Sequence, residues 1–349
     1  MKTASGVSYV EIATGVMALD HGLPFTLDQA DAVIFDVDGV LVEVSDSFRQ
    51  VISLTVQFYF NRILEIPGQE RLIRAEETGH FKLAGRFNND WELAKGVVAQ
   101  GLLKFLSANG THPITIERLR EIPPLVEDFT AEVKKRGGGL EETIKLVKGK
   151  LGESLFREFE SHYKPRLIKK IFMEYYAGPQ LCRSFYGFDP KYYRGPGLIE
   201  KEQAILDLSL IRKLAESGIP FGILSGRTTE EAAYLFRKTG LDKFLKPEFV
   251  ITDDGTLPGK PDPAGLQLLA KRMGFSNGIY VGDVPDDWTA VENYRLQNPG
   301  RPPIACCMVQ TGAASAELMA EFYAESEVDF LATDVNCLLR AMASGSRSK

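Results

Sequence analysis

The sequence predicts an α/β protein with a doubly wound parallel sheet and a large α-helical segment inserted after the first strand of that sheet. Three observations support this prediction. Apolar runs such as 32–35 and 219–224 do not alternate with polar residues, which is typical of buried parallel strands. From residue 200 onward, such runs alternate with helical patterns. Residues 46–198, in contrast, show mostly helical periodicity.

The composition is that of an ordinary globular chain that is long enough for two domains. The chain has 349 residues, of which 44% are hydrophobic and 25% charged, and its formal net charge is -6. Because this balance creates no positive field, we expect no nucleic acid and no anionic membrane as a partner. No apolar run approaches membrane-spanning length, and the N-terminus lacks a secretory pattern. We therefore expect a cytoplasmic protein.

The cysteines and histidines argue against zinc chemistry. Four residues of each type occur, without the spacing of metal ligands. Cys306 and Cys307 are neighbours in a predicted strand, so their side chains should point to opposite faces of the sheet. We interpret the cysteines as small buried side chains in a reducing compartment.

The elements follow one another in a simple order. Residues 1–30 have no strong period, and the strand at 32–36 follows them. Helices are predicted to about Leu106 and over about 140–176, and Gly195-Pro196-Gly197 indicates a linker back to the sheet. A helix over about 200–217 is predicted next, and then strands at 219–224, 249–252, 279–281, 304–309 and 330–331. The predicted domains are a discontinuous core, residues 1–45 with 199–349, and a helical cap, residues 46–198.

Two carboxylates mark the end of the first predicted strand. Asp36 stands at the strand tip, Asp38 follows two residues later, and Gly39 allows the chain to turn sharply. Ligands and catalytic groups gather at the carboxyl ends of strands in such sheets. An ordinary acidic turn is the alternative interpretation, because Asp and Gly are common in turns.

Three further polar segments follow later strands. They are Ser225-Gly226-Arg227, Gly259-Lys260-Pro261-Asp262-Pro263 and Gly282-Asp283-Val284-Pro285-Asp286-Asp287. With Asp36-Val37-Asp38-Gly39-Val40-Leu41, these segments resemble, in order, the four motifs of the haloacid dehalogenase-like (HAD) hydrolase superfamily. The resemblance covers most of the chain beyond the first thirty residues. It implies a Rossmann-like core, with a helical cap between the first and second motifs.

The resemblance also implies roles for the motif residues. Asp36 would be the nucleophile that forms an aspartyl-phosphate, and Asp38 the general acid and base. Ser225, with its neighbours Gly226 and Arg227, would hold a phosphoryl oxygen, although a serine there is also typical of a helix N-cap. Lys260 would bridge the nucleophile and the phosphoryl group.

A magnesium ion is the implied cofactor. Asp36, Asp283 and the backbone carbonyl of Asp38 would hold it, because oxygen ligands suit this hard cation. Asp287 fits the supporting acidic position by spacing, with the adjacent Asp286 as the alternative. Family members that dehalogenate lack a carboxylate at the position of Asp38, so its presence favours phosphoryl transfer.

One segment of the predicted cap is unusual, Arg86-Phe87-Asn88-Asn89-Asp90-Trp91. Arg86 could pair with a carboxylate or phosphate, and Asn88 and Asn89 could bind hydroxyl groups. The segment also resembles a subgroup of largely uncharacterised HAD phosphatases. The alternative interpretation is a helix cap in front of a helix that buries Trp91.

The predicted function is hydrolysis of a small-molecule phosphate monoester by a magnesium-dependent phosphatase. A sugar phosphate, phosphoglycolate or an amino-alcohol phosphate would each be a suitable partner. A phosphomutase with the same nucleophile is the main alternative, because it would carry the same two carboxylates. A non-catalytic HAD-fold binding protein and a dehalogenase are the others, and the full set of motif residues disfavours both.

Overall fold

The chain forms two compact units in the computed structural model. The first unit comprises Met1–Val44 and Gln203–Lys349, and the second comprises Ser45–Glu202. The structure describes residues 7–87, 89–108, 113–312, 319, 322, 323 and 326–345. Among these residues, no helix is both long enough and apolar enough to cross a bilayer.

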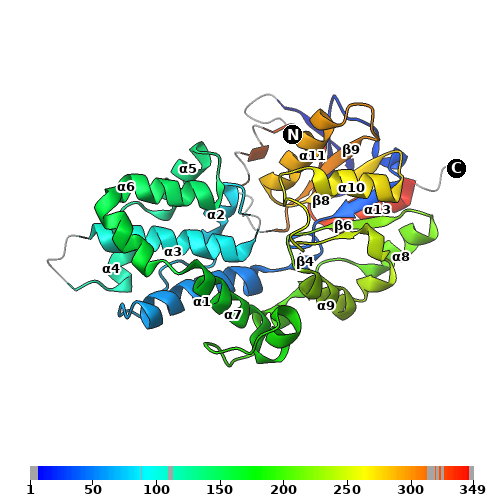
Figure 1. The fold of residues 1–349 in the computed structure, drawn as a ribbon. Coiled ribbons are helices and arrows are strands. Elements are labelled where there is room, and N and C mark those ends of the chain that lie inside the picture. The colour runs from blue at the N-terminus through cyan, green and yellow to red at the C-terminus, as the bar shows by residue number, and fades with distance from the viewer. Residues whose placement is uncertain are drawn as a thin grey trace. The chain divides into compact units, whose positions relative to one another are not determined.

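An eight-stranded sheet forms the centre of the first unit (Figure 1). Its strands are β1 (Tyr9–Ala13), β2 (Val16–Leu19), β3 (Ala32–Phe35), β6 (Phe221–Leu224), β7 (Val250–Ile251), β8 (Gly278–Gly282), β9 (Ile304–Val309) and β10 (Phe330–Ala332). Their order is β1-β2-β10-β9-β8-β3-β6-β7. From β10 to β7 all neighbours are parallel, whereas β2 pairs antiparallel with both β1 and β10. The predicted doubly wound parallel sheet is confirmed, with a hairpin added at one edge.

The central strands are buried on both faces, which explains their continuous apolar character. Every residue of β3, β6, β8 and β9 is buried. Cys306 and Cys307 lie in β9, and both are buried free thiols. The strands also fix the register of their ends, because Phe35 pairs with Ile223 on one side and with Val281 on the other. The residues that follow these three strands therefore emerge at one level of the sheet.

The helices of the first unit are α8 (Leu208–Glu216), α9 (Thr229–Thr239), α10 (Ala264–Met273), α11 (Pro285–Gln297) and α13 (Val335–Gly345). The start of α9 is well defined. The backbone N–H of Glu231 donates to the Thr228 hydroxyl, and the Glu231 carboxylate accepts from the Thr228 N–H. This capping box begins the helix directly after the turn that contains Ser225.

The predicted helix over 200–217 is shorter in the structure. Gln203–Ala204 forms a short strand, β5, which pairs antiparallel with β4 (Val42–Glu43). The helix α8 begins only at Leu208, because the Asp207 carboxylate accepts the N–H of Ser209 as an N-cap. Strand pairing and the cap thus override the helical pattern of the preceding residues.

The second unit is helical (Figure 1). Its α-helices are α1 (Gln50–Phe58), α2 (Gly79–Leu83), α3 (Asp90–Ser107), α4 (Ile116–Glu121), α5 (Val126–Lys135), α6 (Gly139–His162) and α7 (Pro165–Tyr186). The helix α3 contacts α1, α6 and α7, and most of its residues are buried. The Trp91 ring meets Phe172 edge to face, with ring centroids 6.2 Å apart.

The helical stretch predicted over about 140–176 is interrupted twice, at Gly152 within α6, where φ is +70°, and between α6 and α7. The helix α6 ends at His162, and Tyr163 is extended. Pro165 then occupies the first position of α7, where its missing N–H costs no intrahelical hydrogen bond. The apolar period continues on both sides of this break, so the pattern alone did not reveal it.

Candidate active site

Four of the predicted site residues lie at one edge of the sheet. Asp36 directly follows β3, Ser225 follows β6 and Asp283 follows β8. Because these strands are parallel neighbours in the order β8-β3-β6, their carboxyl ends meet at the same edge. Lys260 reaches this edge from the loop before α10, and its ammonium lies 2.9 Å from Asp36 Oδ2.

Asp36 is nearly enclosed, with 6% of its surface exposed. Its backbone N–H donates to Val281 O at 2.8 Å, which continues the sheet pairing into the loop. Burial raises the pKa of the Asp36 carboxyl to about 7, against the lowering effect of Lys260; Asp287 and Asp38 raise it further. This carboxylate is therefore poorly solvated, which favours the approach of a cationic partner.

Lys260 connects two carboxylates. Its Nζ lies 2.6 Å from Asp287 Oδ1 as well as 2.9 Å from Asp36 Oδ2, and 3.2 Å from the hydroxyl of Tyr280. Burial alone would lower the pKa of the Lys260 amine, but Asp287 and Asp36 outweigh it and raise that pKa well above its ordinary value. Lys260 is consequently a fixed positive charge beside Asp36.

Asp287 anchors the turn between β8 and α11. It is fully buried, and its Oδ2 accepts the backbone N–H groups of Asp283 at 3.0 Å and Val284 at 3.1 Å. Its Oδ1 accepts the Tyr280 hydroxyl at 2.8 Å and contacts Lys260. The neighbouring Asp286 is only half-buried. Of the two alternatives, Asp287 is thus the residue in contact with Lys260.

Tyr280 was not among the predicted site residues. It lies in the buried strand β8, within the strand predicted over 279–281. A tyrosine in such a strand needs a partner for its hydroxyl, and this requirement was the available signal. The identity of the partner, Asp287, depends on the turn that follows the strand.

The donor set suits a hard divalent cation. Within the described part of the chain, Asp36, Asp283 and Asp287 each offer a carboxylate oxygen, and these atoms lie within 4.8 Å of one another. All three residues are buried. A Cβ added at Gly39 or at Gly312 would clash with the carboxylate of Asp283, so backbone packs directly against this group. Buried carboxylates this close repel one another, and a cation would relieve that repulsion.

The Asp38 side chain is directed to a different partner. Its Oδ1 accepts from Nε of Arg227 at 2.8 Å and also contacts Nη2 of the same guanidinium. Arg227 has only 2% of its surface exposed. Its backbone N–H lies 3.3 Å from Ser225 Oγ, and its carbonyl accepts the N–H of Asp253 at 2.8 Å. The turn after β6 thus holds both Ser225 and the group that contacts Asp38.

Two predicted turn residues support these contacts. Gly39 has φ +76°, a left-handed conformation that favours glycine, and its N–H donates to Val42 O at 2.9 Å. Ser225 is buried, and its N–H donates to Ile251 O at 3.0 Å. Gly226, between Ser225 and Arg227, is half-buried.

The predicted substrate-binding residues of the cap belong to the second unit. Asn88 lies outside the described residues. Arg86 is exposed and has φ +59°. Asn89 occupies the N-cap position of α3 without a side-chain cap hydrogen bond, and its carbonyl accepts the N–H of Glu92 at 2.9 Å. Trp91 is buried, as the helix-cap interpretation of this segment expects.

Comparison with known proteins gives a family for the chain. The family model for haloacid dehalogenase-like hydrolases matches residues 30–293. A protein of Phytophthora nicotianae named imidazoleglycerol-phosphate dehydratase is 35% identical over 260 residues, which are 73% of this chain and 40% of that protein. The chain thus spans less than half the length of this curated relative.

Solved structures agree with the observed fold. The phosphatase Tt82 from Thermococcus thioreducens is 26% identical, with a TM-score of 0.57 over 90% of this chain and 99% of that chain. A structural-genomics target is 15% identical, with a TM-score of 0.53 over 87% of this chain and 96% of that chain. The second likeness concerns the fold alone.

Proposed function

Because the chain belongs to the haloacid dehalogenase-like hydrolase family, as a phosphatase-like enzyme, we propose that it hydrolyses a small-molecule phosphate monoester with Mg²⁺ and an intermediate on Asp36. The observation that carries this proposal is the contact of the buried Asp36 with Lys260, next to Asp283 and Asp287. This arrangement combines a nucleophilic carboxylate, a fixed positive charge and a candidate cation site. A non-catalytic binding protein would need none of these groups.

In the proposed first step, Asp36 attacks phosphorus. A bond forms between a carboxylate oxygen and phosphorus, and the bond from phosphorus to the ester oxygen breaks. Asp38 gives a proton to the departing alkoxide. Lys260, Ser225 Oγ and the nearby backbone N–H groups would stabilise the charge on the phosphoryl oxygens.

In the second step, water attacks the phosphorus of the aspartyl-phosphate. Asp38 takes the proton from that water, and the bond between phosphorus and Asp36 breaks, which releases inorganic phosphate. Asp36, Asp283 and the backbone carbonyl of Asp38 would hold the Mg²⁺, with Asp287 in support. When bound, the ion would reduce the repulsion between the phosphate and the attacking carboxylate.

We propose residues 1–45 and 199–349 as the catalytic core and residues 46–198 as a cap. A cap that closes over the core would exclude bulk water during the reaction. Arg86, Asn88 and Asn89 are the proposed substrate contacts of that cap. The phosphomutase alternative has no particular observation in its favour.

Four classes of phosphate monoester are candidate substrates. A sugar phosphate, phosphoglycolate and an amino-alcohol phosphate are the starting candidates. The name of the Phytophthora nicotianae relative adds a fourth, an imidazole-bearing alcohol phosphate, because that protein includes a segment similar to this chain. All four are phosphate monoesters of small alcohols.

The test is release of inorganic phosphate from these four compounds, with Mg²⁺ and with EDTA. Metal-dependent release by the native chain, together with its loss in Asp36→Asn, supports the proposal. The control is Asp31→Asn, at an exposed carboxylate that accepts the N–H groups of Ser276 and Asn277. An isomeric phosphate ester without free phosphate would identify a mutase instead. Turnover by Asp36→Asn at the native rate would remove Asp36 from its proposed role.

A further inference from the structure

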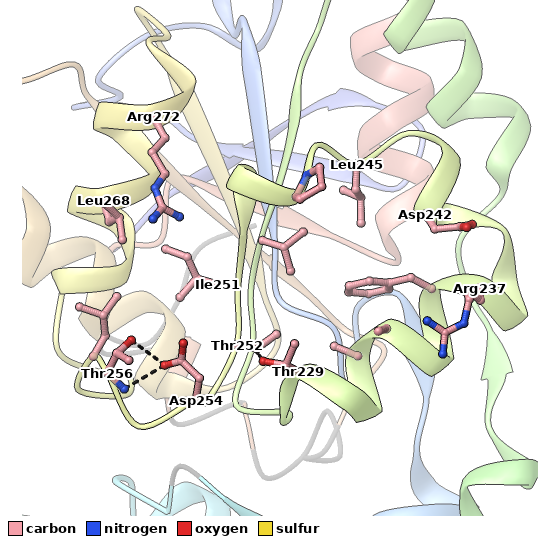
Figure 2. Close-up of a pocket in the computed structure, with 16 residues that line it drawn as sticks. Thr229, Arg237, Asp242, Leu245, Ile251, Thr252, Asp254, Thr256, Leu268 and Arg272 are labelled. Carbon is pink, nitrogen blue, oxygen red and sulfur yellow. Dashed lines mark hydrogen bonds between the residues drawn. The ribbon is translucent and has the colours of Figure 1, made fainter. Parts of the chain in front are cut away.

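A cavity lies in the first unit, along the free side of strand β7. Its volume is about 560 Å³, within the range of small-molecule sites. Residues from α9, β7 and α10 line it, as Figure 2 shows. None of the residues with a proposed catalytic or metal-binding role is among the lining residues.

The topology explains why this space remains open. The connection through α9 leads from β6 outward to β7, whereas the connection through α10 leads from β7 back to β8. Because crossovers between parallel strands are almost always right-handed, connections in opposite directions place α9 and α10 on opposite faces of the sheet. β7 ends the strand order and is only two residues long. The two helices therefore flank an edge that no other strand of the described residues covers.

The free edge of β7 presents one hydrogen-bond acceptor and one donor. Ile251 O accepts the Ser225 N–H, so the backbone groups of Ile251 face β6. The groups of Val250 and Thr252 consequently face outward, toward the cavity. Within the described residues, neither the Val250 C=O nor the Thr252 N–H has a hydrogen-bond partner. These two groups match the edge of a heteroaromatic ring that carries an adjacent donor and acceptor.

The rest of the lining mixes apolar side chains with charged and hydroxyl-bearing ones. Phe236, Leu245 and Leu268 contribute apolar surface. Figure 2 shows the Arg272 side chain extending from α10 toward Ile251, whereas Arg237 and Asp242 lie on the other side of β7. The Arg272 Nη1 donates to Glu248 O at 3.0 Å, which leaves the other donors of the guanidinium available for an anion.

The lining carboxylate of Asp254 is already engaged. Asp254 Oδ1 accepts the backbone N–H of Thr256 at 2.9 Å and its hydroxyl at 2.6 Å. In the described part of the chain, no ion pair joins Asp254 to Arg272. Arg272 forms no ion pair with any carboxylate among the described residues, so its guanidinium could bind an anionic group of a ligand.

We propose that this cavity is a second ligand site, separate from the Asp36 site, for a small heteroaromatic anion. The ring would lie on Phe236 and Leu268, donate to the Val250 C=O and accept from the Thr252 N–H. The anionic group would bind Arg272. This proposal is independent of the proposed phosphatase activity.

The probe is 3′,5′-cyclic AMP, titrated into the full chain by calorimetry. It has a heteroaromatic edge and a negative charge, and as a phosphodiester it is not a substrate for a monoesterase. We expect saturable binding that is about tenfold weaker in Arg272→Ala, with Lys271→Ala, a change in the adjacent basic residue outside the cavity, as the matched control. We expect a similar loss in Thr252→Pro, which removes the N–H donor, but native affinity in Thr252→Val, which keeps it.

Three outcomes would overturn the proposal. They are absence of saturable binding at millimolar probe, equal affinity in Arg272→Ala and the native chain, and loss of probe binding in Lys260→Met, which would indicate binding at the Asp36 site. If Thr252→Pro does not fold, the test is the NMR amide signals of Val250 to Thr252 in the native chain, recorded with and without the probe. Unchanged amide signals on addition of probe would contradict the site, whereas shifts confined to this edge would support it.

Discussion

Nε of Arg227 lies 2.8 Å from Oδ1 of Asp38, and the guanidinium is almost completely removed from solvent. The contact joins the turn after β3 to the turn after β6, which are far apart in the sequence but adjacent in the sheet. Arg227 thus fixes the side chain that we propose as general acid and base.

Replacement of Arg227 should therefore affect turnover more than substrate affinity. We expect Arg227→Met to lower kcat by about tenfold to a hundredfold, because a hydrogen bond to a charged group contributes about 1.5–3 kcal/mol. The measurement is steady-state kinetics on the best substrate of the panel. Lys238→Met, at an exposed position of α9 outside the cavity of Figure 2, is the control. An unchanged kcat in Arg227→Met would show that Asp38 needs no such partner.

Lys260→Met should be more severe. It removes the positive charge that lies between Asp36 and Asp287, and we expect kcat to fall by about 100- to 1000-fold, as for loss of an oxyanion-stabilising donor. Kinetics and far-UV circular dichroism should be measured together, because a folded variant with near-native kcat would exclude this role for Lys260.

Mg²⁺ should stabilise the chain against unfolding. An ion that binds only the folded state adds about 2.7 kcal/mol at roughly one hundred times its Kd. We expect the Tm to rise with Mg²⁺ concentration and to return to its starting value with EDTA. Asp283→Asn should remove this rise, whereas Asp286→Asn, next to the buried cluster but outside it, should retain it. Equal shifts in both variants would place the ion elsewhere.

Lys104 gives a pH-dependent prediction in the helical unit. Its side chain is buried in α3 and donates to Arg120 O at 3.3 Å. Burial lowers the pKa of Lys104 to about 8, and Arg120 adds to this effect. Below pH 8 the folded state carries an unfavourable charge, which Lys104→Met removes. We expect this variant to be more stable by on the order of 1–3 kcal/mol at about pH 7.

The advantage of Lys104→Met should shrink as pH rises. Between the lowered pKa and the ordinary value of 10.5, the unfolded chain binds more protons than the folded chain, so native stability increases. Urea unfolding of both proteins at about pH 7 and about pH 9.5 measures the difference. A constant difference across this range would contradict the assigned pKa.

The strand-end residues could be predicted because local sequence contains their signal. Asp36, Ser225 and Asp283 each follow an uninterrupted apolar run, and parallel pairing brings such positions together. The contacts of Lys260 and the partner of Asp38 could not be predicted in the same way. They depend on which side chains meet across neighbouring loops, and no local period records that.

Other features required tertiary information for similar reasons. A hydrophobic pattern does not predict which groups a buried tyrosine hydroxyl contacts. The Tyr280 hydroxyl contacts both Asp287 and Lys260. The break between α6 and α7 lies within a continuous helical period, where one proline determines the boundary. The pairing of β5 with β4 overrides the helical pattern before Leu208.

The order of the strands has a consequence for biosynthesis. The central strand β3 pairs with β6 and β8, whereas all of the helical unit lies between β3 and β6 in the chain. During synthesis, Val33 can therefore pair with Phe221, and later with Ile279, only after each of these residues has been added to the chain. At typical elongation rates this delay is on the order of 10 to 50 s. During that time the whole helical unit is synthesised, while the apolar strand β3 lacks the two strands that flank it in the sheet.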